Sequence, residues 1–405
     1  MMSEKKIFEL AQECQNYTVN IRHALHEMPE LGWKEEKTIA LILSEIRQIS
    51  QDSKIPMTCK ENVGGIWVDL NFHSDRERIL YRADIDALPI QEETHLPFSS
   101  KHLGLMHACG HDCHAAMLLG ALKIFASGKI LPYYNLRLVW QRAEEVGTIQ
   151  SGGSKLVEEG ALEGISYCYG LHISSTETSG EFISRPNAIM CQAGQLQVEI
   201  SCSGGHVMQP EAGSNAIDIM AEIHTALRGF ELRALGPNER ISFVPSISKA
   251  GTVCNIRPDH GEIWYAVRNF LTEKRLDDFI SSIRKRIESI IQSYPHAHLS
   301  KFVYFSGYPP LFNDSKNTQF VKTLLDKHFP TTKTPLMFSG EDFSYYLQDR
   351  IGSYWLLGAK KGKQTDHHTS EFNPDEEVLW QGIVFWLLLA QHPYAKESIT
   401  HTAWG

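Results

Sequence analysis

A nine-residue segment, MHACGHDCH at residues 106–114, brings together two thiols, three imidazoles and a carboxylate. Cys109 and His111 are only two residues apart, so an extended or turn conformation would let both side chains reach one ion. A thiolate and a neutral imidazole suit zinc, and also manganese, cobalt or nickel when carboxylates complete the shell. A hydrophobic core does not require such a density of ligands, so the segment predicts a metal site.

Polar side chains also follow four predicted strands at their carboxyl ends. These strands and the residues after them are 79–84 with Asp84 and Asp86, 136–141 with Glu144 and Glu145, 167–171 with His172, and 353–357 with His367 and His368. Ligands of open α/β sheets bind outside the carboxyl ends of the strands. We therefore expect Asp, Cys, His, Glu and His from five separate points of the chain to meet at one edge of one sheet.

These residue types together predict a two-metal hydrolytic centre. Two ions would polarise a scissile carbonyl and lower the pKa of a bound water. Glu144 and Glu145 are adjacent and point in different directions, which suits one carboxylate as a metal ligand and the other as a general base. Taken singly, the glutamate pair is typical of a solvated helix start, the aspartates of a turn, and the Cys/His segment of a structural zinc site. Their coincidence favours catalysis.

The spacing of apolar residues predicts an α/β protein with a second domain inserted in it. Helical periods cover about the first 49 residues, with a break at 28–32, and strands then alternate with helices to residue 173. From about residue 195 the order becomes strand, helix, two strands, helix and strand, which is the ferredoxin-like plan. We expect a catalytic domain with a mixed, mostly parallel sheet flanked by helices over 1–188 and 305–405, and an inserted ferredoxin-like α+β lid over 189–304.

The composition of the chain indicates which kinds of partner the protein binds and in which compartment it is found. A net charge of −9 gives no support for binding to nucleic acid or to an anionic membrane. The longest apolar run, 383–390, is far shorter than the roughly 20 residues that span a bilayer. The first six residues are polar with no apolar region after them, and the eight cysteines are scattered, which favours reduced thiols. We therefore expect a soluble, cytoplasmic protein.

Ordered motifs along nearly the whole chain resemble one enzyme family. They are HEMPELG (26–32), RADIDALPI (82–90), MHACGHD (106–112), AEE (143–145), GLH (170–172), GGH (204–206), SGEDF (339–343) and His368 four residues before Phe372. This ordered set resembles the aminoacylase and carboxypeptidase-G type of di-metal peptidases, in particular the hippurate hydrolase and N-acyl-amino-acid amidohydrolase branch. The implied metal ligands are Cys109, His111, Glu145, His172 and His368, with Cys109 bridging two divalent ions (zinc, manganese, cobalt or nickel).

The resemblance also implies roles for residues that do not bind metal. Glu144 would be the general base, and Asp86 would orient the metal ligands. In the inserted domain, the residues that would bind the substrate are His206, Asn255 and Arg268. In related families this lid mediates dimers, so a homodimer through the lid is a further expectation.

The chain departs from the family pattern at a few positions. Arg142 stands where the family usually has proline before Ala-Glu-Glu, which places a cation close to the base. Cys113 replaces a usual glycine, Arg257 replaces an apolar residue, and 207–210 are bulkier than expected after His206. None of these changes removes a metal ligand, so we expect activity with an unusual substrate pocket.

The expected function is a metal-dependent amidohydrolase. Attack of metal-bound water would cleave the acyl amide of a hippurate-like, N-acetyl- or other N-acyl-amino acid, or of a very short peptide. Two alternatives stay open at this point. One is a catalytically silent binder of acylated amino acids on the same fold. The other uses Cys109 as a nucleophile, which would be indifferent to chelators and would leave Glu144 and His368 without a function.

Overall fold

The structure, a computed structural model, describes residues 3–147, 150–237, 239–362 and 365–394. Its contacts divide the chain into two units. The first unit is Met1–Ile189, Leu311–Pro335 and Asp342–Gly405, and the second is Met190–Pro310 and Leu336–Glu341. The domain boundaries expected from the sequence stay a proposal.

The first unit is built on an eight-stranded sheet in the order β1-β2-β4-β3-β5-β16-β6-β15. The strands are β1 (Met57–Asn62), β2 (Gly65–Leu70), β3 (Arg78–Asp84), β4 (Asn135–Gln141), β5 (Ile165–Ser174), β6 (Phe182–Ser184), β15 (Thr331–Lys333) and β16 (Ile351–Gly358). The central neighbours β4, β3, β5 and β16 run parallel, whereas β1, β2 and β6 pair antiparallel with β2, β4 and β16. The carboxyl ends of the four central strands therefore share one edge of the sheet.

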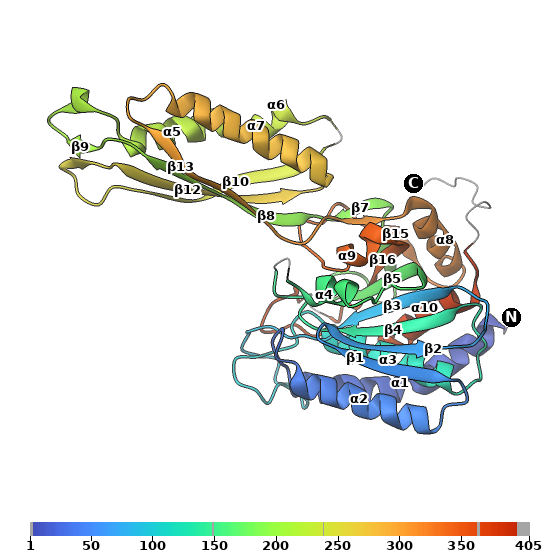
Figure 1. The fold of residues 1–405 in the computed structure, drawn as a ribbon. Helices are drawn as coiled ribbons and strands as arrows, with labels where there is room; N and C mark the ends of the chain where they lie inside the picture. The colour runs from blue at the N-terminus through green and yellow to red at the C-terminus, as the bar shows by residue number, and fades with distance from the viewer. Residues whose placement is uncertain (1–2, 148–149, 238, 363–364, 395–405) are drawn as a thin grey trace. The chain divides into compact units, whose positions relative to one another are not determined.

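Helices cover both faces of this sheet. They are α1 (Glu4–His26), α2 (Glu36–Gln51), α3 (His111–Ala126), α4 (Gly152–Glu158), α8 (Ser315–Leu325), α9 (Ser344–Asp349) and α10 (Leu379–Gln391). Figure 1 shows α1, α2 and α3 on one face and α4 on the opposite face. In α1, buried residues recur at the three- and four-residue spacing of one helical face, as at Ile7, Leu10 and Cys14. α10 is buried almost all round, so it fills the core between its neighbours.

The second unit is a four-stranded antiparallel sheet with helices on one face (Figure 1). Its main elements are β8 (Gln192–Ser201), α5 (Ala216–Leu227), α6 (Phe230–Ala234), β10 (Ile241–Ala250), β12 (His260–Asn269), α7 (Glu273–Ile291) and β13 (His298–Ser306). The strand order β10-β12-β8-β13 is that of a ferredoxin-like fold. Four short strands form two further pairs, β9 (Gly205–His206) with β11 (Ile256–Arg257) and β7 (Asn187–Met190) with β14 (Leu311–Asn313).

The predicted fold class is confirmed: a mixed sheet flanked by helices, with a ferredoxin-like second unit. One helix begins earlier than expected, because α3 starts at His111 and not near Ala115. Gly110, with φ 95°, turns the chain directly into that helix in a left-handed conformation that glycine adopts without strain. The sequence pattern also did not predict β1, whose side chains are mostly exposed.

No helix among the described residues is both long and apolar enough to cross a membrane. The eight cysteines all carry free thiols in the structure.

Candidate metal centre

The shared edge of β4, β3, β5 and β16 collects the residues that could bind metal. Among the described residues, five groups of three have potential ligand atoms within 4.8 Å of one another, and two of these groups contain Cys109. The first group is Cys109, His111 and His172, and the second is Cys109, Glu145 and His368. Cys109 belongs to both groups, so the geometry places its sulfur between two potential ion positions.

Close contacts within and between these groups join side chains from distant parts of the chain. The Sγ of Cys109 lies 3.4 Å from the Nε2 of His172. The Nε2 of His368 lies 3.0 Å from the Oε1 of Glu145, and the Nε2 of His111 lies 3.9 Å from the same oxygen. Three of these side chains, those of Cys109, Glu145 and His368, come from the connections after β3, β4 and β16. His172 lies near the carboxyl end of β5, and His111 begins α3.

Asp86 makes hydrogen bonds to two of these five residues. The Nδ1 of His111 donates to the backbone oxygen of Asp86 at 2.9 Å and lies 3.1 Å from its Oδ1. The Oδ2 of Asp86 accepts the backbone N–H of Glu145 at 2.8 Å. Burial alone would lower the pKa of His111, but the charge of Asp84 and the hydrogen bond to Asp86 outweigh it and raise the pKa to about 10. With Nδ1 directed at Asp86, a bound cation would displace the proton of Nε2 and use that lone pair.

His172 is held in the same tautomer by the backbone. Its Nδ1 donates to the oxygen of Ile173 at 2.6 Å, so Nε2 faces Cys109 with its lone pair. Burial, followed by the charge of His114, lowers the pKa of His172 well below its usual value. The imidazole is therefore neutral, which is the form that binds metal. His172 lies within β5, whereas the sequence placed it just after a shorter strand.

The donor set fits divalent cations. The Nε2 of His111 is buried and makes no hydrogen bond to any described residue. Burial, together with the charges of Glu145 and Glu144, raises the pKa of the Cys109 thiol well above its usual value. A divalent cation would offset the crowding of carboxylates and stabilise the thiolate. Unlike His111, His367 does not have a free Nε2 for metal binding, because this atom accepts the backbone N–H of Ser175 at 3.3 Å.

A buried network beside the ligands connects Asp84, which the sequence predicted at this edge, to residues without a predicted role. His114 donates from Nδ1 to the Oδ1 of Asp84 at 2.5 Å and accepts the N–H of Ile173 at Nε2 at 2.8 Å. Arg82 lies between Asp84 and Asp342, at 2.5 Å and 2.6 Å. The motifs at 82–90 and 339–343 held these residues, but only the fold shows that they meet.

A second buried cluster joins α1 to the start of α3. The Oδ2 of Asp112 lies 2.8 Å from the Nδ1 of His26 and 3.4 Å from the Nε of Arg22. The Nε2 of His26 lies 3.4 Å from the Oε1 of Glu92. Burial alone would lower the pKa of His26, but the hydrogen bonds to Asp112 and Glu92 outweigh it and raise the pKa to about 9. The cluster ties the helix turn that carries His111 to α1.

The residues predicted to bind substrate all lie in the second unit, at two separate places. His206 in β9 pairs with Ile256, and the N–H of Val207 donates to the oxygen of Asn255 at 3.3 Å, so His206 and Asn255 are neighbours. Figure 1 shows β9 at one end of the sheet. Arg268 lies near the other end of β12, eight residues from His260, which is roughly 25 Å along a strand. One copy of this unit does not bring Arg268 to His206.

Arg257, one of the departures from the family pattern, supports the loop that carries His206. It is buried, and its guanidinium donates to the backbone oxygens of Pro210 at 3.2 Å, Gly213 at 2.7 Å and Gly204 at 2.8 Å. Three carbonyl partners replace the apolar packing expected at this position. The substitution therefore stabilises the turn before and after His206.

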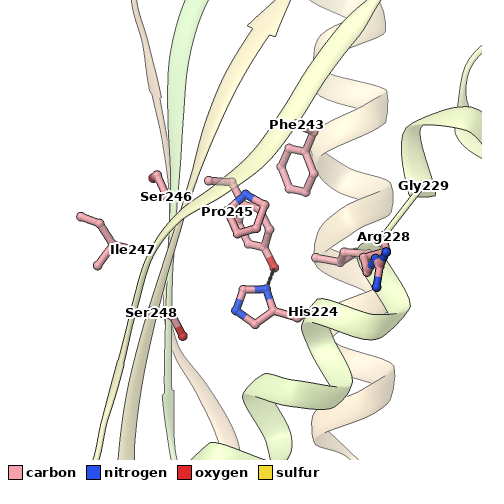
Figure 2. Close-up of a pocket in the computed structure, with 10 residues that line it drawn as sticks. His224, Arg228, Gly229, Phe243, Pro245, Ser246, Ile247 and Ser248 are labelled. Atoms are coloured by element: carbon pink, nitrogen blue, oxygen red, sulfur yellow. Dashed lines mark hydrogen bonds between the residues drawn. The ribbon is translucent and has the colours of Figure 1, made fainter.

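The second unit contains a cavity of about 520 Å³, which is a poor candidate for metal binding. In its wall, the hydroxyl of Tyr265 lies 3.4 Å from the Nδ1 of His224. Figure 2 labels His224 and marks this hydrogen bond with a dashed line. The lining includes Arg228 and Phe243 but contains no carboxylate or thiol. A single imidazole beside a guanidinium does not make a site for divalent cations.

Comparison with known proteins decides the family. The model of "Peptidase family M20/M25/M40" matches residues 80–392. The thermostable carboxypeptidase 1 of Saccharolobus solfataricus is 33% identical over 393 residues, which cover 95% of this chain and 98% of that protein. This chain belongs to peptidase family M20/M25/M40. It is a hydrolase that acts on amide bonds, as the sequence predicted.

Two further relatives match over most of their length. The N-acetyl-L-cysteine deacetylase of Bacillus subtilis is 32% identical over 370 residues, which cover 91% of this chain and 86% of that protein. The crystal structure of a dinuclear metal-binding peptidase of family M20 from Bacillus subtilis has a TM-score of 0.79 at 27% identity, covering 93% of this chain and 98% of that one. The predicted resemblance is confirmed, and membership of a metal-binding peptidase family agrees with the ligand groups found here.

Proposed function

We propose that this M20-family enzyme hydrolyses the acyl amide of N-acylated amino acids or very short peptides, with two divalent ions bound at the sheet edge. One observation carries the proposal: two groups of ligand atoms share Cys109, and Glu144 lies beside them in a group with His111 and Glu145. Zinc, manganese, cobalt and nickel all suit this mixture of sulfur, nitrogen and oxygen donors.

Each ion would have its own ligands besides the shared sulfur. Cys109, His111 and His172 would hold one ion, and Cys109, Glu145 and His368 would hold the other. Bound divalent cations supply polarisation of the scissile carbonyl and a lower pKa for an attacking water.

Glu144 is the proposed general base. It is 7% exposed, so it is shielded from bulk water yet lies at the edge of the ligand groups. Its carboxylate would take a proton from the attacking water and deliver it to the leaving nitrogen as the amide bond breaks. Asp86 would act by orientation, because it fixes both the ring of His111 and the backbone of Glu145.

The substrate class rests on relatives and on side-chain chemistry. The N-acetyl-L-cysteine deacetylase and the thermostable carboxypeptidase 1 are named for substrates with an amide next to a free carboxylate. A guanidinium such as that of Arg268 binds a carboxylate through two parallel hydrogen bonds. We propose that Arg268 binds the substrate carboxylate and that His206, with Asn255, binds the acyl carbonyl.

The distance between Arg268 and His206 supports a homodimer. Arg268 lies roughly 25 Å along β12 from His260, and His206 lies in the separate β9–β11 pair, which precedes the His260 end of β12 in sequence. A single small substrate would therefore reach both residues only if they came from two chains. β10 is one of the two edge strands of the four-stranded sheet and exposes Val244 and Ile247. We propose that β10 contributes to the contact between the two copies.

The test is hydrolysis of a panel of N-acyl-amino acids and dipeptides by the purified protein, with and without chelator. We expect release of a free amino acid that a chelator abolishes and added metal restores. A chelator-insensitive activity that an alkylating agent blocks would instead support Cys109 as a nucleophile. Tight binding of the same compounds without turnover would support the silent binder.

A further inference from the structure

The residue before the proposed base has a strained backbone. Ala143 has φ +52°, in the left-handed region that non-glycine residues rarely adopt, and its side chain is fully buried. This conformation costs free energy and persists only where the surroundings fix it. Since Ala143 immediately precedes Glu144, its backbone angles decide the direction of that carboxylate.

A buried carboxylate binds the backbone N–H of Ala143 in this conformation. The Oε1 of Glu35 accepts the backbone N–H of Ala143 at 2.7 Å. The Oε2 of Glu35 accepts from the Nε of Arg142 at 2.9 Å. Glu35 lies just before α2, far from Glu144 in sequence, and its side chain is 0% exposed.

The other backbone groups around Ala143 are also hydrogen-bonded. The N–H of Arg142 donates to Gly64 at 2.9 Å, and the N–H of Gly152 donates to the oxygen of Ala143 at 3.2 Å. A proline at position 142 would have no N–H for the first of these bonds. Arg142 therefore adds a backbone hydrogen bond and a charged partner for Glu35 at the position where a proline was expected. The sequence suggested that the guanidinium of Arg142 would lie close to the proposed base, Glu144. In the structure, this guanidinium pairs with Glu35.

We propose that Glu35, paired with Arg142, is a positioning residue that aims the carboxylate of Glu144 by holding Ala143 in the left-handed conformation. This inference rests on the proposed role of Glu144. Without Glu35, the N–H of Ala143 loses its acceptor in a buried place, and the backbone relaxes toward a conformation that turns Glu144 away. A misplacement of about 1 Å costs roughly 100-fold in rate where geometry limits the reaction.

The test compares Glu35→Ala and Glu35→Gln with a matched control, Glu36→Gln, whose residue is exposed at the start of α2. Wild type and Glu144→Gln are assayed first, because their turnover decides the proposed function independently. We then expect kcat to fall roughly tenfold to 100-fold in Glu35→Ala, and less in Glu35→Gln, which keeps one acceptor. KM and metal content should stay at the wild-type value, and Glu36→Gln should match wild type.

A second variant separates positioning from general stability. Glycine adopts positive φ without strain, so Ala143→Gly in the Glu35→Ala background should recover several-fold of the lost kcat. A crystal structure of Glu35→Ala should show φ of residue 143 outside the left-handed region. Unchanged kcat in both Glu35 variants, an unchanged φ at Ala143, or loss of metal in step with kcat would overturn the proposal.

Discussion

Glu144 and Glu145 are sequence neighbours with different surroundings. Glu145 lies 3.0 Å from His368, and its backbone N–H is held by Asp86. Glu144 belongs to the group of His111 and Glu145 but not to either group that contains Cys109. This difference matches the division between a ligand and a base that adjacent carboxylates suggest.

Replacing the base tests that division. We expect Glu144→Gln to lower kcat by roughly 10²–10⁴-fold, because an amide does not accept the proton of the attacking water. Metal content should be unchanged. The matched control is Glu158→Gln, whose side chain is 68% exposed at the end of α4. Full turnover in Glu144→Gln would show that another group is the base.

Asp86 is expected to act on metal affinity. Because it fixes His111 and the backbone of Glu145, Asp86→Ala should weaken metal binding by roughly tenfold to 100-fold. Competition with a chelator of known affinity measures this directly. An affinity equal to that of wild type would mean that the ligands are held in place by other contacts.

At the scale of elements, the ends of the central parallel strands could be predicted from the sequence. Apolar runs followed by Asp, Glu and His showed which residues would meet, because parallel strands present their carboxyl ends at one edge. The supporting residues could not be predicted in this way. Glu35, Asp342 and His26 reach the site from distant elements, and nothing in their local sequence shows that the fold buries them there.

The contact between α1 and α3 predicts a pH dependence of stability. The pKa of His26 is about 9, above its usual value, so protonated His26 stabilises the fold fully below pH 6.5. This contribution, on the order of 3 kcal/mol, is lost as the pH rises from 6.5 to 9. Denaturant unfolding of metal-loaded wild type and His26→Gln at several pH values measures it. If the free energy of unfolding changed with pH to the same extent in wild type and in His26→Gln, His26 would not be the source of this pH dependence.

At the scale of the whole molecule, the separation of Arg268 and His206 predicts complementation between chains. Each of the variants His206→Ala and Arg268→Gln should lose most activity alone. After the two variants are mixed and exchange subunits, half of the dimers would contain one chain of each variant. One of the two sites in each such dimer would be intact. Activity should then return to about a quarter of wild type.

No recovery on mixing, in a preparation shown to exchange subunits, would mean that both residues act from one chain or not on the same substrate. The oligomeric state is checked by sedimentation. Val244→Asp in β10 should shift the protein toward monomer, whereas Leu103→Asp, on the most exposed apolar side chain of the first unit, should not.

The central claim is that two ions share Cys109, and metal stoichiometry tests it most directly. Wild type should hold about two ions per chain after reloading. His172→Ala and Glu145→Gln each remove a ligand of only one of the two groups that contain Cys109, so each should retain about one ion, whereas Cys109→Ala should retain less than either. Two ions in Cys109→Ala, or no metal in wild type after reloading, would contradict the account.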